Sequence, residues 1–392
     1  MKIKEQVREL EPLLVKIRRH FHQYPELSNQ ETGTMEQICT YLEEWGIEYQ
    51  KGVADTGVVA IIRGGRPGRT AALRGDIDAL PIQETNDVPY RSCHDGVMHA
   101  CGHDVHTTVA LGAAKILQSM AGELQGNVKI FFQPAEETTG GAERMIAQGC
   151  LENPHVDAVF GLHVSPAVEA GRVELRYGKM NAASDMLTIL IRGKSTHGAE
   201  PQKGVDPIVI ASNVVMALQS LISRNLSPVE SGIVTLGSIH GGTKGNVIPD
   251  EVRMEGILRT LDPETRCRMK QRLKEMIEKV SEAYGGQGRL LIEESYAPLI
   301  NDDKMVELVK ATAETVVGPE KIQIAPAPSM GAEDFSFFSQ ERPACFFNLG
   351  CGNTARGIDK PLHNSGFDVD EACLSVGVEM QVRNVLRFLN EE

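Results

Sequence analysis

The stretch from Met98 to His106 gathers one thiol and three imidazoles within nine residues, in the order MHACGHDVH. Cys101 and His103 flank Gly102, which lets the backbone bend, so both side chains can converge from a loop. Thiolate sulfur and imidazole nitrogen are ligands that zinc-like transition ions prefer. The alternative is a solvated polar loop, which would need no matching residues elsewhere. The stretch therefore predicts two metal ligands, Cys101 and His103.

Three more residues of ligand type occur further along the chain, two of them at or just after the ends of predicted strands. Glu137 follows a predicted strand that Pro134 stops, His163 closes the next strand, and His363 lies in the segment Leu362–Asn364. A lone histidine on a strand is more often packed or exposed than ligating, so the prediction depends on the whole set. One sulfur, three imidazoles and one carboxylate exceed the needs of one tetrahedral ion but suit two ions sharing a water.

Glu136 stands beside the predicted ligand Glu137. Adjacent side chains point in different directions, so one can hold a metal while its neighbour takes a proton. Glu136 is predicted to be a general base that deprotonates a metal-bound water and returns the proton to a leaving amine. The alternative is a pair of exposed glutamates at a helix start, where acids are favoured. Asp76 and Asp78 are predicted to accept hydrogen bonds that orient ligands, with a solvated acidic loop as their alternative.

Composition limits the class of protein. The chain has 392 residues, of which 41% are hydrophobic and 24% charged, and its net charge is −13. This charge argues against nucleic acid or an anionic membrane surface as a partner. The N-terminus has no apolar signal core, and no run is expected to span a bilayer. Eight scattered cysteines without framework spacing are typical of a reduced cytoplasmic enzyme.

The elements that must position these residues alternate between helix and strand. Apolar spacing predicts helices near 7–17, 35–42 and 105–117, and strands at 58–63, 70–74, 128–132 and 156–160. Ser28 and Glu31 have capping-box spacing before the second helix, and Asp104 is predicted to cap the third. The pattern favours an α/β catalytic domain with a mixed sheet flanked by helices. Ligands of such sheets bind beyond the carboxyl ends of the strands, where the candidate residues fall.

The character of the chain changes near Asp185. Strands at 186–191, 233–239, 252–259 and 289–293 and helices at 208–221 and 264–284 follow in the order βαββαβ, which predicts a ferredoxin-like α+β domain. Residues of catalytic or ligand type occur again at Gly331–Phe335. The second domain, 185–297, is therefore expected to be inserted into a first domain made of 1–184 and 298–392.

Three residues of the inserted domain could contact a substrate. His197 and Asn246 lie on predicted loops and could donate hydrogen bonds to a developing oxyanion. Arg259 lies on a predicted strand, where its guanidinium could bind a carboxylate. Taken alone, each is more often structural.

These segments together resemble the amidohydrolase branch of the large cocatalytic metallopeptidase family, which includes hippurate hydrolases, indole-acetyl-amino-acid hydrolases and bacterial N-acyl-amino-acid deacylases. The resemblance runs nearly end to end. The matching segments are Arg18–Leu27, Leu73–Pro81, Met98–Asp104, Phe132–Glu137, His197–Ala199, Gly245–Pro249, Met330–Phe335 and Leu362–Asn364.

The resemblance implies a catalytic domain with an inserted lid that also forms a homodimer. It implies two divalent ions on Cys101, His103, Glu137, His163 and His363, with Glu136 as the base. A lid histidine, matching His197, would serve the neighbouring subunit's site together with Asn246. The thiolate favours zinc, cobalt or nickel, and the resemblance adds manganese. Gln202 stands where relatives often have histidine, and Lys244 where relatives vary; both departures concern substrate preference.

The expected activity is metal-dependent hydrolysis of the amide of a small N-acyl-amino acid of acetyl, benzoyl or indole-acetyl type. A dipeptidase or aminopeptidase is the first alternative, but it would need a group to hold a free α-amine. A catalytically silent ligand-binding protein is the second, and a missing base or ligand would favour it. A redox protein built on Cys101 is disfavoured, because the sequence has no Cys-x-x-Cys pair.

Overall fold

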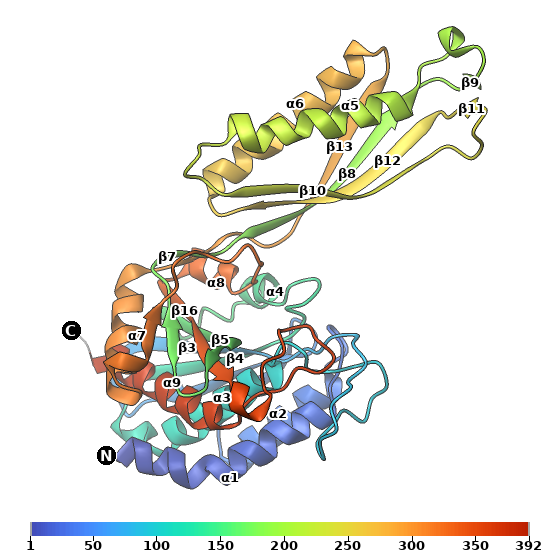
Figure 1. Cartoon of the computed structure of the whole chain (residues 1–392). Coiled ribbons are helices and arrows are strands. Elements are labelled where there is room, and N and C mark those ends of the chain that lie inside the picture. Colours follow the sequence, from blue (N-terminus) through green and yellow to red (C-terminus); the bar gives the residue numbers. More distant parts are fainter. Residues whose placement is uncertain (1, 391–392) are drawn as a thin grey trace. The chain divides into compact units, whose positions relative to one another are not determined.

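The computed structural model describes residues 2–390, which divide into two compact units (Figure 1). Of the described residues, the first unit comprises 2–178, 300–327 and 334–390, and the second comprises Lys179–Leu299 and Pro328–Glu333. The segment 328–333 was assigned to the first domain from the sequence. It joins the second unit because its backbone is bonded there: Ser329 N donates to Met180 O at 2.8 Å, and Ala182 N donates to Gly331 O at 2.9 Å.

A mixed sheet of eight strands, in the order β1-β2-β4-β3-β5-β16-β6-β15, forms the centre of the first unit. β3 pairs in parallel with β4 and β5, and β5 with β16, whereas β1, β2 and β4 pair antiparallel. The predicted mixed α/β fold is confirmed. The strands are β1 Glu48–Val53, β2 Gly57–Arg63, β3 Arg66–Asp76, β4 Gln125–Gln133, β5 Ala158–Glu169, β6 Val173–Leu175, β15 Ile322–Ile324 and β16 Ala344–Gly352.

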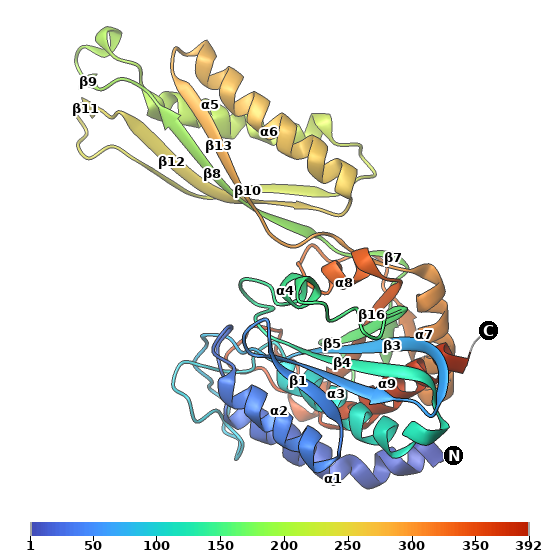
Figure 2. The same ribbon diagram turned by 180° about the vertical axis from the view of Figure 1, so that it is seen from behind.

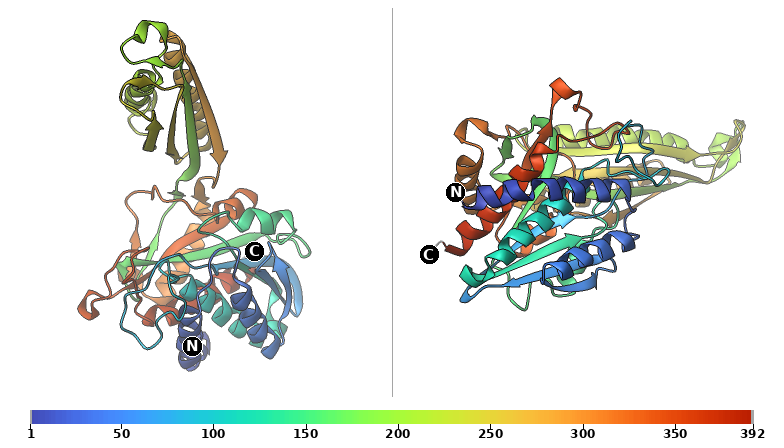
Figure 3. Two further views of the ribbon diagram at one scale, coloured as in Figure 1. Left: turned by 90° about the vertical axis from the view of Figure 1, so that its right-hand side faces the viewer. Right: turned by 90° about the horizontal axis from the view of Figure 1, so that it is seen from below.

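Helices cover both faces of this sheet. On one face, α1 (Lys2–Gln23), α3 (His103–Ser119) and α9 (Ala372–Asn390) lie side by side, as the right-hand view of Figure 3 shows. The short helices α4 (Ala142–Ala147) and α8 (Ser336–Glu341) lie on the other face (Figure 2). The remaining helices are α2 Thr32–Glu44 and α7 Asp303–Val316.

The packing of α3 shows how closely this layer is built. A Cβ atom on Gly112 would lie 2.7 Å from side-chain atoms of both Leu14 on α1 and Val378 on α9. Leu14 and Val378 are fully buried. The three helices can approach each other this closely only because no side chain stands at this position.

The second unit has a four-stranded antiparallel sheet in the order β10-β12-β8-β13, with α5 and α6 on one face (Figure 1). The chain order, β8-α5-β10-β12-α6-β13, is the expected βαββαβ succession. The elements are β8 Ala183–Arg192, α5 Pro207–Ser220, β10 Gly232–Gly241, β12 Glu251–Thr260, α6 Pro263–Ala283 and β13 Gln287–Glu294. A separate two-stranded ribbon joins β9 (Thr196–His197) to β11 (Val247–Ile248).

One helical segment departs from the expectation that no run could span a bilayer. Pro207–Asn225, which is α5 with the turn that follows it, is long and apolar enough to do so by length and composition alone. Core helices pass the same test. Here Ile210, Val214 and Leu218 belong to the buried core of the second unit, which accounts for the apolar composition of one face.

A buried ionic network fixes the start of α3. Arg18 Nε donates to Asp104 Oδ2 at 2.8 Å, and His22 Nδ1 lies 2.8 Å from the same oxygen. His22 Nε2 lies 3.2 Å from Glu84 Oε1, and all four side chains are fully buried. Asp104, predicted to be the cap of α3, instead lies in its first turn, because Gly102 occupies the N-cap position. Its carboxylate therefore ties α3 to α1.

The network sets the charge of His22. Burial and the neighbouring Arg18 charge lower the pKa of His22, but hydrogen bonds to Asp104 and Glu84 outweigh them and raise it above the ordinary value. A raised folded-state pKa contributes stability below the unfolded-state pKa, and that contribution is lost as the pH rises through the folded-state pKa.

We therefore predict that the metal-free protein loses stability from this source as the pH rises through the raised folded-state pKa of His22. His22→Gln should remove this part of the pH dependence, as measured by urea unfolding in the presence of chelator. His155→Gln, at an exposed histidine, is the control and should keep the wild-type slope. Identical slopes in wild type and His22→Gln would contradict the prediction.

Candidate metal centre

The structure brings all five predicted ligands together in the first unit. Cys101 Sγ lies 3.3 Å from His163 Nε2 and 3.3 Å from His363 Nε2. Glu137 Oε1 lies 3.3 Å from His363 Nε2 and 3.8 Å from His103 Nε2. Donor atoms from four distant segments thus face one small volume, which is the arrangement that a pair of metal ions requires.

Local backbone geometry delivers these side chains. Gly102, between Cys101 and His103, has φ +84°, a left-handed conformation that glycine adopts readily. His163 lies within β5. His363 also has a positive φ, +61°, and its N–H donates to Ala100 O at 2.8 Å. A non-glycine residue keeps this conformation only where the surroundings hold it, and here the tie is to the residue before Cys101.

Hydrogen bonds select which nitrogen of each histidine faces the cluster. His103 Nδ1 lies 3.1 Å from Asp78 Oδ1, and His163 Nδ1 lies 2.8 Å from Val164 O. Both Nδ1 atoms must therefore carry a proton, so that in the neutral ring each Nε2 has a lone pair for a metal. Within the described residues, His103 Nε2 and Glu137 Oε1 are buried without a hydrogen-bond partner. Buried unsatisfied atoms are unfavourable, and bound cations would satisfy them.

The electrostatics of the cluster also favour a cation. Burial lowers the pKa of His103, but the carboxylates of Asp76 and Asp78 outweigh it and raise that pKa to about 10. Burial and the nearby Glu137 raise the pKa of the Cys101 thiol. Without a cation the site therefore holds protons on both ligands, and a divalent ion would displace them.

Asp78 supports two ligands at once. Its Oδ1 holds His103, and its Oδ2 accepts hydrogen bonds from Glu137 N at 3.0 Å and from Ser28 Oγ at 2.7 Å. Ser28 was predicted to belong to a capping box with Glu31. In the structure Glu31 is the N-cap of α2 and makes no side-chain capping bond. Its carboxylate instead accepts hydrogen bonds from Ala135 N and Thr56 Oγ1.

Asp76 links the cluster to His106, to which the sequence alone assigned no role. Its Oδ1 lies 2.5 Å from His106 Nδ1, and its Oδ2 accepts from Arg74 Nη1 at 2.5 Å. His106 Nε2 accepts from Val164 N at 2.9 Å, so neither ring nitrogen is available to a metal. The His106 ring packs edge-on against His163 with centroids 4.6 Å apart. The signal for this role was the helical spacing of His103 and His106.

Glu136 lies at the same cluster. Its side chain is 7% exposed, and its carboxylate, Glu137 and His103 have ligand-type atoms within 4.8 Å of one another. A base at this position can reach a water held between the ligands.

The other predicted substrate contacts belong to the second unit. His197 and Val247 pair across the β9–β11 ribbon, and Gly198 N donates to Asn246 O at 2.8 Å. His197 Nδ1 accepts from Ala199 N at 3.1 Å, so in the neutral ring Nε2 carries the proton and can donate it. A pocket of about 540 Å³ lies beside this ribbon, with Gly198 and Lys244 in its wall.

Arg259 on β12 is half-buried, and burial lowers its pKa. Within the described chain, its Nη1 is buried without a hydrogen-bond partner. An anion such as a carboxylate would satisfy it.

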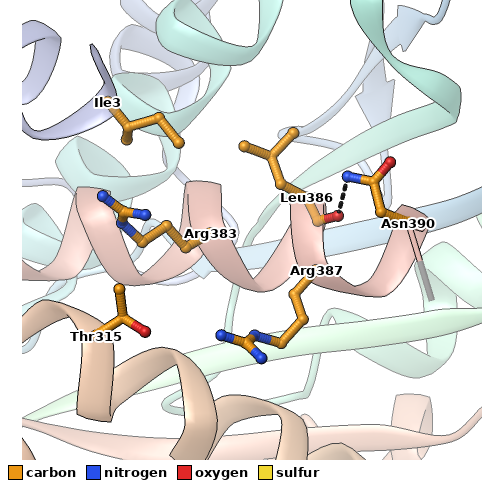
Figure 4. Close-up of a pocket in the computed structure, with 6 residues that line it drawn as sticks. All are labelled: Ile3, Thr315, Arg383, Leu386, Arg387 and Asn390. Atoms are coloured by element: carbon orange, nitrogen blue, oxygen red, sulfur yellow. Dashed lines mark hydrogen bonds between the residues drawn. The ribbon is translucent and has the colours of Figure 1, made fainter. Parts of the chain in front are cut away.

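A further pocket, of about 350 Å³, lies along α9 (Figure 4). Its lining residues are Ile3, Thr315, Arg383, Leu386, Arg387 and Asn390. None of them is a histidine, cysteine or carboxylate, so this pocket is not a metal site. The candidate centre is the cluster at the carboxyl ends of the strands.

Comparison with known proteins identifies the family of the chain. Residues 72–387 match the family described as Peptidase family M20/M25/M40, so the chain belongs to that family. It is 42% identical to an N-acetyl-L-cysteine deacetylase of Bacillus subtilis, covering 98% of this chain and 90% of that protein. It is 39% identical to an IAA-amino acid hydrolase of Arabidopsis thaliana, covering 96% and 86%.

A solved structure from Bacillus subtilis, described as a dinuclear metal binding peptidase of the same family, superimposes with a TM-score of 0.85. It has 32% sequence identity and covers 97% of this chain and 99% of that chain. The protein is therefore an enzyme, a metal-dependent hydrolase of the amidohydrolase branch, as predicted.

Gly102 tests how the loop holds its two ligands. A Cβ atom at this position would lie 2.3 Å from Val164 Cγ2 and would stand on left-handed backbone. We predict that Gly102→Ala separates Cys101 from His103 and weakens metal binding by at least roughly tenfold, a loss of about 1.4 kcal/mol. The measurement is metal per chain after dialysis against a graded series of chelator concentrations.

Gly96→Ala is the matched control. Gly96 also has a positive φ, +74°, but no atom lies within 4 Å of the added Cβ. This variant should lose about 1–2 kcal/mol of stability from backbone strain and keep its metal affinity. Equal metal affinity in the two variants would show that the centre tolerates a side chain at position 102, despite the left-handed backbone and the close approach of the added Cβ to Val164.

Proposed function

We propose that the protein hydrolyses the amide bond of small N-acylated amino acids, of acetyl, benzoyl or indole-acetyl type, to a carboxylic acid and a free amino acid. The observation that carries this proposal is the convergence of one sulfur, three imidazole nitrogens and a carboxylate, with the separate carboxylate of Glu136 beside them. Two divalent ions of zinc, cobalt, nickel or manganese, bound by Cys101, His103, Glu137, His163 and His363, would polarise the carbonyl and make water more acidic.

The side chains have distinct tasks in this proposal. Glu136 takes a proton from the attacking water and delivers it to the departing amide nitrogen. His197 Nε2–H and the Asn246 amide donate hydrogen bonds to the oxygen on which negative charge develops. Arg259 uses its unpaired Nη1 to hold the α-carboxylate of the amino-acid part.

We propose that the second unit is a lid and that it also joins two copies of the chain as a homodimer. β10 is an edge strand of its sheet, and it exposes Ile233 and Ile239, while Met216 on the neighbouring α5 is 72% exposed. An exposed edge strand beside apolar side chains supports pairing with a second copy. The eight free cysteines support a cytoplasmic location.

A substrate panel tests the reaction. We predict that protein loaded separately with each of the four metals hydrolyses acetyl-, benzoyl- or indole-acetyl-amino acids at least tenfold faster than free dipeptides. The physical reason is that an acyl group needs no partner for a charged amine, and we locate no such partner at the described site. Faster cleavage of dipeptides would favour the peptidase alternative, and no hydrolysis of either class would favour a ligand-binding protein.

Glu136→Gln is the control for that panel. The substitution keeps the size of the side chain but removes the base, so turnover should fall by about 10²–10⁴-fold. Metal content should stay at the wild-type value, because Glu137 rather than Glu136 is the proposed ligand. Undiminished turnover would remove Glu136 as the base or reveal a contaminating hydrolase.

Mixed dimers test the shared site. His197→Ala and Glu136→Gln should each be nearly inactive, but a hybrid dimer would contain one site with an intact Glu136 and an intact His197 from the partner subunit. Random mixing makes half of the dimers hybrids with one such site of two, so about a quarter of wild-type activity should return. Verified hybrids without recovered activity would show that His197 does not act on the neighbouring subunit.

A further inference from the structure

We infer that Glu31 and Asp334 are positioning residues that hold Glu136 by clamping the backbone of its loop from two sides. The inference rests on the proposed role of Glu136 as the base. Both carboxylates are buried in the first unit, at 0% and 0% exposure, and neither belongs to the five predicted ligands. Their hydrogen bonds go to the loop that carries Glu136.

The loop between β4 and α4, residues 134–141, lacks regular structure to hold it. Ala135 has φ +57°, a conformation that costs a residue with a Cβ about 1–2 kcal/mol. Gly140 N donates to Ala135 O at 2.9 Å, and a Cβ on Gly141 would lie 2.0 Å from Pro134 O. The loop is thus drawn closed at its base, and bonds from outside must maintain this strained shape.

Glu31 holds the near side of the loop. Its Oε1 accepts a hydrogen bond from Ala135 N at 2.9 Å, immediately before Glu136. Its Oε2 accepts from Thr56 Oγ1 at 2.6 Å, which fixes the direction of the carboxylate. The left-handed residue is therefore tied to the start of α2.

Asp334 holds the far side through its Oδ2 atom. Oδ2 accepts from Gly141 N at 2.9 Å and Ala142 N at 3.1 Å. Gln133 Nε2 donates to Oδ2 at 2.7 Å, and Arg74 Nη2 donates to Oδ1 at 2.8 Å. Asp334 thus joins the two ends of the loop, and the Arg74 charge opposes the effect of burial on its carboxylate.

The metal ligand in the same loop has its own support. Glu137 N is bonded to Asp78, which also holds His103. Loosening Glu31 or Asp334 should therefore displace Glu136 more than Glu137. Since misplacement of a reacting group by about 1 Å can lower turnover by roughly 10²-fold, turnover should fall while metal content is retained.

The chemistry of the two clamps differs, and this difference distinguishes positioning from general support. A glutamine at position 31 could still accept from Ala135 N, while its NH₂ donates to the hydroxyl of Thr56. An asparagine at 334 would have to turn its NH₂ toward a donor, because both oxygens of Asp334 accept hydrogen bonds. Glu31→Gln should therefore retain activity that Glu31→Ala loses, whereas Asp334→Asn should lose it.

The experiment is a double-mutant cycle with the two-metal protein, in which kcat, KM and metal content are measured. Glu31→Ala and Asp334→Asn should each lower kcat at least roughly tenfold in the wild-type background, with KM and metal content within about twofold. In the Glu136→Gln background the same changes should lower kcat by less than about twofold, because the group they position is gone. Equal factors in both backgrounds, or loss of metal, would overturn the inference.

Asp157→Asn is the matched control, because Asp157 Oδ2 accepts from the backbone N–H of Thr70 at 2.7 Å, in the same sheet but away from the loop. It should lower thermal stability and leave kcat unchanged. If Asp334→Asn does not fold, the comparison of Glu31→Ala with Glu31→Gln tests the inference alone: kcat should fall in the first and be retained in the second.

Amide hydrogen exchange over 135–142 provides a readout that needs no substrate. Exchange should be faster in Glu31→Ala and Asp334→Asn, and unchanged exchange would refute the clamp. A wild-type protein that hydrolyses no N-acyl-amino acid would refute the proposed function instead, and the exchange result would then still decide on the clamp.

Discussion

A buried group of carboxylates, imidazoles and a thiol is stable only when cations or directed hydrogen bonds compensate it, and the first unit is organised around that requirement. In the free protein the compensation comes partly from protons, since the pKa of His103 rises to about 10 and that of Cys101 also rises. Further compensation comes from Arg74, which bonds Asp76 on one side and Asp334 on the other. Divalent ions would complete the balance at His103 Nε2 and Glu137 Oε1, which are buried without a hydrogen-bond partner among the described residues.

The same requirement explains why so many supporting residues are themselves charged. Asp78 selects the tautomer of His103 and ties down Glu137, while Asp76 engages His106, which packs against His163. Asp76 and Asp78 are themselves buried, and Asp78 bonds the ligands His103 and Glu137 directly, at 3.1 Å and 3.0 Å. Such bonds define direction as well as charge, so the donor atoms can converge before an ion arrives.

Much of the site could be predicted from sequence because its residue types are unusual and their positions regular. Cys101 and His103 stand together in one segment, and Glu137 and His163 follow the strand ends where ligands of α/β sheets gather. The supports could not be predicted in this way. Glu31 and Ser28 have the spacing of a helix cap, yet both carry bonds to other segments, because the tertiary partners Ala135 and Asp78 compete for them.

The limits on the fold prediction have a similar cause. The two sheets and their connecting helices follow from apolar periodicity, which is local. The assignment of 328–333 to the second unit depends on backbone hydrogen bonds to a segment about 150 residues earlier, and no local pattern reports such bonds. The role of His106 depends on the same kind of distant partner.

His363 differs from the other predicted ligands in a way that bears on how the centre is filled. Its side chain is 52% exposed, whereas those of Cys101 and His103 are buried. An ion travelling from solvent would meet this imidazole first, and it would leave past it last. Of the five predicted ligands it is the one most open to solvent, so a competing chelator would contact the centre on this side.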